Sequence, residues 1–319
     1  MHVRLPLLSS LLALFIWIPC ACAAGPEPIA PRPVTLARPG ADAPKPADFD
    51  GLHNVVAYSD GLYSGSAPEG HGLESLADMG IRTVVSVDGA QPDVDAARAL
   101  GLRYVHLPIG YDGMDETRKL ELARVVRDLP GPIYVHCHHG KHRSAGAAAA
   151  IAVMLGRLSN EQALARMKVS GTAPNYTGLY ACATETSLAT AAQIDAASNQ
   201  FPSRWKTTGL VQGMVDIDFA LDNMKAVEKA SWKAPAEHPD LVPAAEVGRI
   251  AHVSRELEDD AEVKAKPAEF LQMLRASTAA AEAFEKALLE SASADVLAGH
   301  MKKLGQSCKD CHVKYRDAH

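Results

Sequence analysis

The chain has 319 residues, of which 47% are hydrophobic and 22% are charged, and its formal net charge at pH 7 is −6. This length has room for about two domains of ordinary size, and the apolar fraction is that of folded globular proteins. The sequence shows no basic stripe that would neutralise a phosphate backbone, so nucleic acid is not expected as a partner.

The first 24 residues (1–24) have the features of a secretory signal peptide. Arg4 precedes a nearly all-apolar run at 5–18, and residues 21–23 read Ala-Cys-Ala, which fits an A-x-A cleavage pattern. The run is too short for a comfortable membrane span. We therefore expect an exported protein, periplasmic or secreted, with no stable membrane insertion. A lipoprotein cysteine at Cys20 or Cys22 is an alternative interpretation of this segment.

Residues 25–48 contain seven prolines. That density prevents regular secondary structure and predicts an extended, proline-rich linker between the signal peptide and the first domain.

From residue 49 to about 198, short β-rich runs alternate with helical ones, and after Ser144 the chain is helical. Strands alternating with helices predict an α/β fold with a short, mostly parallel sheet and flanking helices. The predicted strands are 55–59, 62–67, 83–87, 104–109 and 133–136. The predicted helices that lie between them are 73–79, 93–100 and 116–128.

A polar stretch ending at Pro202 separates this region from a second domain at 203–319. Four amphipathic segments follow with short connections, which predicts an all-α four-helix bundle. The predicted helices are 205–231, 243–259, 267–290 and 294–316.

The segment 132–146 carries the chemistry of the first domain. Cys137 and Arg143 stand in a C-x5-R relation between an apolar strand and an alanine-rich helix. A loop that ends at a helix N-terminus suits a phosphate dianion and stabilises the Cys137 thiolate as a nucleophile. Arg143 can grip two phosphate oxygens, Gly140 lets the backbone turn, and Ser144 can donate a hydrogen bond to the departing thiolate.

A leaving alkoxide needs a proton, and the loop after the fourth predicted strand supplies two carboxyl groups. We expect Asp112 to be the general acid, because a flexible loop at this place can bring it over the phosphate. Asp115 is the alternative, although it is also suited to cap the helix that follows.

The region from about 52 to 190 resembles the dual-specificity branch of the protein tyrosine phosphatase superfamily. The match to its H-C-x-x-G-x-x-R-S/T signature consists of His136, Cys137, Gly140, Arg143 and Ser144. The resemblance implies metal-free hydrolysis of phosphomonoesters, in a phosphorylated protein or a small molecule. It also implies that Ser144 is catalytic together with Cys137, Arg143 and Asp112.

The other residues of the expected phosphate-binding loop are His138, His139, Gly140, Lys141 and His142. The histidines would add positive charge around the phosphate. Lys141 stands where members of the superfamily that act on lipid or inositol phosphates carry a lysine, which makes a polyphosphorylated substrate an option. A metal site in this His/Cys cluster, a rhodanese-like sulfurtransferase and a vestigial motif are the competing interpretations.

Near the C-terminus, Cys308, Cys311 and His312 form C-x-x-C-H, the attachment sequence of c-type haem. In a helix these three residues share a face and can address one porphyrin. A structural zinc site would need two further ligands, and a thioredoxin-like C-x-x-C would follow a strand.

Residues 205–319 resemble cytochrome c′ and related class II c-type cytochromes, on the basis of the motif and the three helices before it. The resemblance implies covalent haem c with His312 as proximal iron ligand, and a distal position facing the first helix. Met214 is the candidate distal ligand there, with Met224 as the alternative. Without either, the iron would be five-coordinate and able to bind small gases. A homodimer and a redox partner are further implications.

Both motifs together predict an exported phosphatase fused to a haem domain for redox sensing, gas sensing or electron transfer. The alternative is a cytochrome whose phosphatase-like domain is an inactive phosphate-binding module. Cys182 is either a buried small residue or a resolving partner for Cys137.

Overall fold

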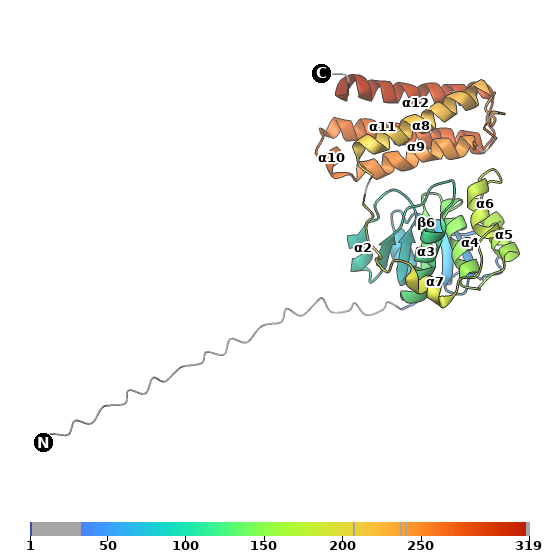
Figure 1. The fold of residues 1–319 in the computed structure, drawn as a ribbon, viewed down its shortest axis with the longest axis vertical. Helices are drawn as coiled ribbons and strands as arrows, with labels where there is room; N and C mark the ends of the chain where they lie inside the picture. The colour runs from blue at the N-terminus through green and yellow to red at the C-terminus, as the bar shows by residue number, and fades with distance from the viewer. Residues whose placement is uncertain (2–32, 207, 237, 240, 317–319) are drawn as a thin grey trace.

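The computed structural model of the protein describes residues 1, 33–206, 208–236, 238–239 and 241–316. The predicted signal peptide lies outside the described residues apart from Met1. Figure 1 shows an α/β region, residues 33–196, with a helical region, residues 210–315, lying across one end of it.

The α/β region contains six strands and seven helices among its described residues. The strands are β1 (Ala47–Phe49), β2 (Leu52–Ser59), β3 (Leu62–Ser66), β4 (Thr83–Ser86), β5 (Arg103–His106) and β6 (Ile133–Cys137). The helices are α1 (Gly72–Asp78), α2 (Val94–Ala99), α3 (Glu116–Asp128), α4 (Arg143–Met154), α5 (Asn160–Val169), α6 (Thr177–Thr184) and α7 (Ala191–Ala196).

The six strands form one mixed sheet in the order β1-β2-β3-β6-β4-β5. The pairs β3–β6, β6–β4 and β4–β5 are parallel, as the alternation of strands and helices predicts, whereas β1–β2 and β2–β3 are antiparallel. β6 lies between β3 and β4. Helix α2, which follows β4, packs on one face of the sheet together with α1, whereas α4, which follows β6, packs on the other face together with α3. Ligands of such sheets bind at the carboxyl ends of strands beside this kind of reversal.

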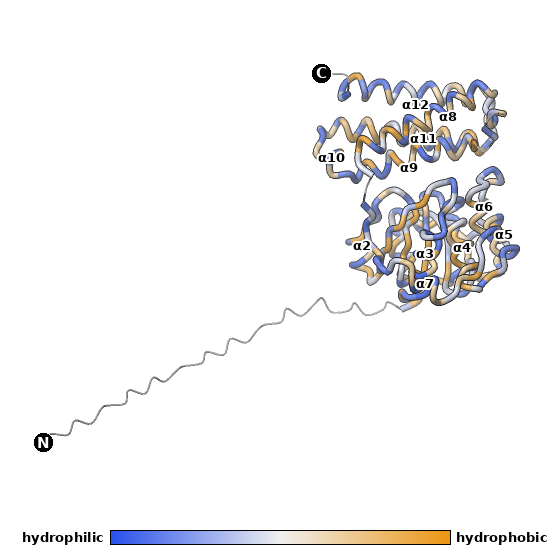
Figure 2. Tube along the Cα trace, in the orientation of Figure 1, coloured by the Kyte–Doolittle hydropathy of each residue, from blue (hydrophilic) through white to orange (hydrophobic). Residues whose placement is uncertain are grey.

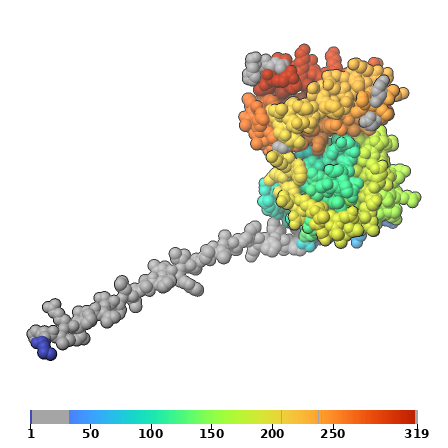
Figure 3. All heavy atoms as spheres, viewed as in Figure 1, coloured from blue at the N-terminus to red at the C-terminus, as the bar shows by residue number. Residues whose placement is uncertain are grey.

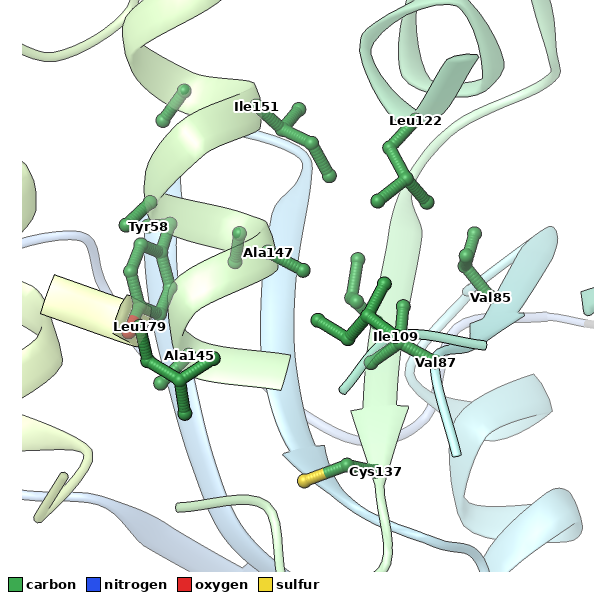
Figure 4. Close-up of a cluster of buried hydrophobic side chains, with 14 of the residues drawn as sticks. Tyr58, Val85, Val87, Ile109, Leu122, Cys137, Ala145, Ala147, Ile151 and Leu179 are labelled. Carbon is green, nitrogen blue, oxygen red and sulfur yellow. The ribbon is translucent and has the colours of Figure 1, made fainter. Parts of the chain in front are cut away.

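Helix α4 lies in the centre of the region, and all of its residues are buried. Its alanines allow close approach to the sheet, and Ile151 contributes the largest aliphatic side chain. Figure 4 shows Ala147 and Ile151 of α4 facing Val85, Val87 and Ile109, with Cys137 at the lower end of β6. This packing fixes where the first turn of α4 lies relative to the end of β6.

The predicted elements of the α/β region agree with the structure to within a few residues, with one omission. β1 pairs with β2 and starts inside the segment 25–48 that we predicted as a linker. The N–H groups of Thr35 and Leu36 also donate to the carbonyl oxygen of Asp78, so the described end of that segment lies against the domain. Proline density does not reveal such contacts, because they depend on partners elsewhere in the chain.

The helical region comprises α8 (Leu210–Lys229), α9 (Pro243–Glu258), α10 (Ala261–Lys264), α11 (Ala268–Leu289) and α12 (Ala294–Tyr315). The four long helices correspond to the four predicted segments and share one apolar core, which includes Met224, Phe284 and Leu304. The short α10 was not predicted. Figure 2 shows apolar and polar residues alternating along these helices. Among the described residues, no helix has the length and hydropathy to cross a membrane.

The two regions are in close contact. Ala244 and Ala245 of α9 are buried in the core of the α/β region, and Leu288 and Leu289 of α11 pack against it. Figure 3 shows the helical region seated directly on the α/β region on the face in view.

Replacing Ile151 with alanine should lower the free energy of unfolding by roughly 2–5 kcal/mol, because the cavity would lie between α4 and the sheet. Leu188→Ala is the control, since that side chain is 68% exposed and its loss should change stability by no more than about 0.5 kcal/mol. Urea unfolding monitored by circular dichroism checks both values. Equal losses in the two variants would contradict the central position of α4.

Candidate functional site

The candidate catalytic loop runs from Cys137, the last residue of β6, to Arg143, the first residue of α4. It therefore lies at the carboxyl end of β6, where the connecting helices change from one face of the sheet to the other. Helix α4 has no side-chain cap at its N-terminus. Its first N–H groups and the positive end of its dipole are thus directed at the loop.

The carbonyl groups of the loop are held on its outer side. Ala67 N–H donates to the oxygen of His138 at 3.1 Å, Asn54 Nδ2 to that of Gly140 at 2.9 Å, and Thr172 Oγ1 to that of Lys141 at 2.6 Å. Because C=O and N–H point in opposite directions across a trans peptide, the N–H groups that follow these carbonyls lie on the other side of the loop. Successive N–H groups on one side make a concavity suited to an anion.

Gly140 meets two requirements of this loop. Its φ is +74°, a left-handed conformation that favours glycine, and a Cβ there would lie 2.3 Å from the carbonyl carbon of Gly65 and from the nitrogen of Ser66. The loop therefore packs directly on the backbone at the end of β3, as the motif predicts for a residue that lets the backbone turn.

The thiol of Cys137 is buried beside a pair of serine hydroxyls. Its Sγ lies 3.4 Å from Oγ of Ser144, and Ser64 Oγ donates to Ser144 Oγ at 3.1 Å. When the sulfur is a thiolate, the Ser144 hydroxyl can turn to donate to it. The structure brings Ser144 next to the thiol, and its donation to a departing thiolate stays a prediction.

Arg143 is 1% exposed and lies in a buried network of charges. Its Nη2 is 2.8 Å from Oδ1 of Asp88, which follows β4, and its Nη1 is 2.5 Å from Nδ1 of His252 on α9. Arg255 of α9 also approaches Asp88, at 3.3 Å. Burial alone would raise the pKa of Asp88, but the neighbouring Arg255 and Arg143 guanidiniums hold it well below its usual range. Asp88 is therefore ionised and balances Arg143.

The loop between β5 and α3 brings Tyr111, not Asp112, to the site. The guanidinium carbon of Arg143 lies 4.5 Å from the centre of the Tyr111 ring, which is buried and stacked on Tyr176. Asp112 is exposed, and in the described part of the chain no hydrogen bond or ion pair joins it to Cys137 or Arg143. Its role as general acid stays a prediction. Asp115 caps α3 by accepting from Arg118 N–H at 2.7 Å.

The histidines of the loop differ from the expectation that they add positive charge. Burial is the main cause that lowers the pKa of His138 and of His142 to about 3, with Arg255 and His139 respectively as the next contributors. Both imidazoles are therefore neutral at pH 7. His142 stacks on Tyr176, while His139 and Lys141 lie at the surface.

Helix α11 adds two carboxyl groups that we did not predict. Oε1 of Glu282 lies 3.2 Å from Nε2 of His138, and the Tyr176 hydroxyl donates to Oε1 of Glu285 at 3.3 Å. Glu285 is buried, and burial raises its pKa although Arg143 and Arg255 oppose the shift. These residues and His252 are more than 100 positions from the loop, so no local motif indicates them. Asp88 was accessible to prediction, since it follows a parallel strand next to β6.

Cys308, Cys311 and His312 share a half-buried face of α12, as predicted. Both thiols are free and lie at the edge of the helical core, together with the half-buried Met214 of α8. Burial raises the pKa of both cysteines. Among the described helices, α8 packs mainly along α9 and α12 mainly along α11. The donor set and its partial burial fit a covalently attached planar group on this face.

No group of three or more His, Cys, Asp or Glu side chains is arranged to hold a metal ion within the described residues. Cys182 is buried in α6, where its Sγ contacts the carbonyl oxygen of Gly178, and burial raises the pKa of its thiol. These properties fit a small core residue.

Comparison with known proteins gives one relative by sequence. No family model matches the chain. Over 120 residues it is 27% identical to the dual specificity protein phosphatase TpbA of Pseudomonas aeruginosa (strain UCBPP-PA14), a match over 37% of this chain and 55% of that protein. The chain thus spans about half the length of this relative. The α/β region is similar to a dual-specificity phosphatase.

Solved structures of phosphatases match a part of the chain. The crystal structure of P. aeruginosa TpbA covers 44% of this chain and 89% of its own, with 24% identity and a TM-score of 0.38. A putative phosphatase (DUF442) from Shewanella putrefaciens CN-32 covers 43% and 92%, with 17% identity and a TM-score of 0.36. The core catalytic domain of the PP-IP phosphatase SIW14 from S. cerevisiae covers 46% and 87%, with 13% identity and a TM-score of 0.34.

Gly140→Ala should destabilise the protein more than Gly61→Ala. Both glycines have a φ of +74°, but a Cβ at Gly61 meets nothing within 4 Å, whereas one at Gly140 collides with the end of β3. We expect a cost of about 1 kcal/mol for the backbone conformation at Gly61 and roughly 2–4 kcal/mol for conformation plus collision at Gly140. Thermal unfolding of both variants measures the difference, and equal costs would contradict the packing of the loop on β3.

Proposed function

We propose that the α/β region is a cysteine-dependent phosphomonoester phosphatase of the protein tyrosine or dual-specificity type. The observation that carries the proposal is the loop itself: Cys137, Arg143 and Ser144 meet at the uncapped N-terminus of α4, and the loop carbonyls are held outward. The similarity to a dual-specificity phosphatase supports it.

The first step of the proposed reaction forms a bond between the sulfur of Cys137 and the phosphorus of the substrate. The bond from phosphorus to the leaving oxygen breaks, and that oxygen takes a proton from a general acid. Arg143 and the loop N–H groups bind the phosphoryl oxygens as negative charge develops on them. In the second step a water attacks phosphorus, the S–P bond breaks, and the Ser144 hydroxyl donates to the departing thiolate.

We assign the general acid to Asp112, which would protonate the leaving group and then take a proton from water. Asp112 is exposed while Tyr111 covers Arg143, and these neighbours project to different sides of one loop. Exchange of their positions by a turn of the loop at 110–115, next to Gly113 with its φ of +104°, would bring the carboxyl group to the phosphate. Substrates would be phosphorylated proteins or small phosphomonoesters.

The test is hydrolysis of an aryl phosphate by the full mature chain and by three variants. Cys137→Ser should abolish turnover, Arg143→Lys should lower kcat/KM by about 10²- to 10⁴-fold, and Asp112→Ala should lower kcat by about 10²-fold or more. Cys182→Ser is the matched control for loss of a buried thiol and should keep wild-type turnover.

Absence of turnover under reducing conditions, both in the wild type and in a variant whose Cys137 is accessible to alkylation, would reject the enzyme. The α/β region would then be an inactive phosphate-binding module. Retention of turnover in Asp112→Ala, with loss in Cys137→Ser, would reject only the assignment of the acid.

We further propose that the helical region carries haem c, attached through thioether bonds to Cys308 and Cys311, with His312 as the proximal iron ligand and Met214 as the candidate distal ligand. The C-x-x-C-H motif and the half-buried, free thiols beside the helical core support the assignment. When bound, the haem iron would supply electron transfer or binding of small gases. An exported chain, a redox partner and a homodimer belong to the same proposal.

Covalent haem should remain on the polypeptide after denaturing electrophoresis when the chain is exported by a host that matures c-type cytochromes. Cys308→Ala and Cys311→Ala should each weaken or abolish this haem stain, because each removes one thioether. Cys182→Ala should leave it intact. Met214→Ala should change the visible spectrum if Met214 ligates the iron, whereas Met224→Ala should not.

A further inference from the structure

The candidate active site is closed in this structure. Cys137 is 3% exposed and Arg143 is 1% exposed, although a phosphatase must admit a phosphate group between them. The residues that close it come largely from α9 and α11 of the helical region, which lie across the carboxyl end of the sheet (Figure 1).

His252 of α9 makes the central contact. Its Nδ1 accepts from Arg143 Nη1 at 2.5 Å and from Gly89 N–H at 3.0 Å. Burial and then Arg143 lower the pKa of His252 to about 4, so the imidazole is neutral at pH 7 and its Nδ1 lone pair is an acceptor. Nδ1 thus accepts a hydrogen bond from the guanidinium that the proposed reaction needs for binding phosphoryl oxygens. No phosphate oxygen can stand between two atoms 2.5 Å apart.

Further contacts hold both helices on the α/β region around this point. Arg255 of α9 pairs with Asp88, and Glu282 of α11 lies beside His138 of the loop. At the end of α9, Asp259 accepts from Gln91 N–H at 3.0 Å. Together with the buried Ala244 and Ala245, these contacts form one continuous interface.

The same interface fixes the loop that carries the proposed acid. Gly248 of α9 lies directly on Tyr111: a Cβ on this glycine would be 2.9 Å from Cζ of the Tyr111 ring. Tyr111 is thus held between Gly248 and Arg143, with Asp112 outside. The contact surface of α9 and α11 therefore has two effects. It covers the Cys137 thiol, and it keeps Asp112 outside the site.

We propose that the helical region is an autoinhibitory cover of the phosphatase site, with His252 occupying the phosphate position on Arg143 and Gly248 holding Tyr111 in place. Turnover requires α9 and α11 to move away from the loop. This inference rests on the proposed phosphatase function for its consequence, but the covering of Cys137 is measurable without any turnover.

The experiment uses the full, haem-loaded chain with Gly248→Leu as a wedge. A leucine there cannot fit against Tyr111, and it favours the helical conformation of α9 more than glycine does. Gly299→Leu on α12 is the matched control, because a Cβ at Gly299 meets nothing within 4 Å. The readouts are the rate of Cys137 alkylation by iodoacetamide, mapped by peptide mass, and the hydrolysis of an aryl phosphate.

We expect Gly248→Leu to raise both the alkylation rate of Cys137 and kcat/KM by roughly tenfold or more, through a shift of the population toward the open form. Gly299→Leu should match the wild type in both. Faster alkylation in Gly248→Leu, with no turnover in any of the three proteins, would uphold the cover and reject the phosphatase. Equal alkylation rates in wild type, Gly248→Leu and Gly299→Leu would overturn the cover.

Glu282→Ala decides the matter if the wedge variant fails to fold, as judged by its far-ultraviolet circular dichroism. This change removes the contact with His138 and the ion pair with Arg255 without adding volume at the interface. Faster alkylation of Cys137 than in the wild type supports the cover. The cover is overturned if the alkylation rate is the same in this variant and in the wild type, and if Cys137 in both reacts as fast as in the urea-unfolded chain.

Discussion

Burial of the Arg143 guanidinium is the constraint on which the rest of the site depends. A cation removed from water is costly unless its charge and its N–H groups have partners. Nη2 of Arg143 pairs with the ionised Asp88 and its Nη1 donates to the neutral His252, whereas its buried Nε has no hydrogen-bond partner among the described residues. Asp88 comes from the α/β region and His252 from the helical region. The charge of Arg143 therefore links the two halves of the molecule.

Arg255 extends this link, since it contacts both Asp88 and Glu282. Helix α11, which carries Glu282, has a different neighbour on its other side: Ser277 Oγ donates to Ser307 Oγ at 3.0 Å, one residue before Cys308. One helix thus contacts both the candidate catalytic loop, through His138, and α12 next to the C-x-x-C-H motif. A change in α12 that displaced α11 would also move Glu282. The proposed haem domain could therefore influence the proposed active site through α11.

Local patterns predicted most of the fold and the centre of the site. Strands and helices of the α/β region have periodic apolar residues, and Cys137, Gly140, Arg143 and Ser144 are close in sequence, so their juxtaposition follows from a single strand–loop–helix unit. Contacts made across the chain left no such pattern. β1 has three residues and depends on β2 for its conformation.

The same limit applies to the residues around the loop. His252 lies 109 positions from Arg143, and nothing in the periodicity of α9 distinguishes a face that covers a neighbouring domain from one that faces its own core. Tyr111 and Asp112 are adjacent, and the sequence indicated the polar one for the site. Packing against Gly248 and Tyr176 placed the aromatic one there instead.

The apolar contacts of Ala244, Ala245, Leu288 and Leu289 with the α/β core have a consequence for how the chain can be divided. A fragment ending near residue 198 would leave bare the hydrophobic surface that these four side chains cover. Exposed apolar patches of this kind promote self-association. Solubility of the isolated first half would therefore have to come from a substitute for α9 and α11, so the helical region also keeps an apolar surface of the α/β region away from water.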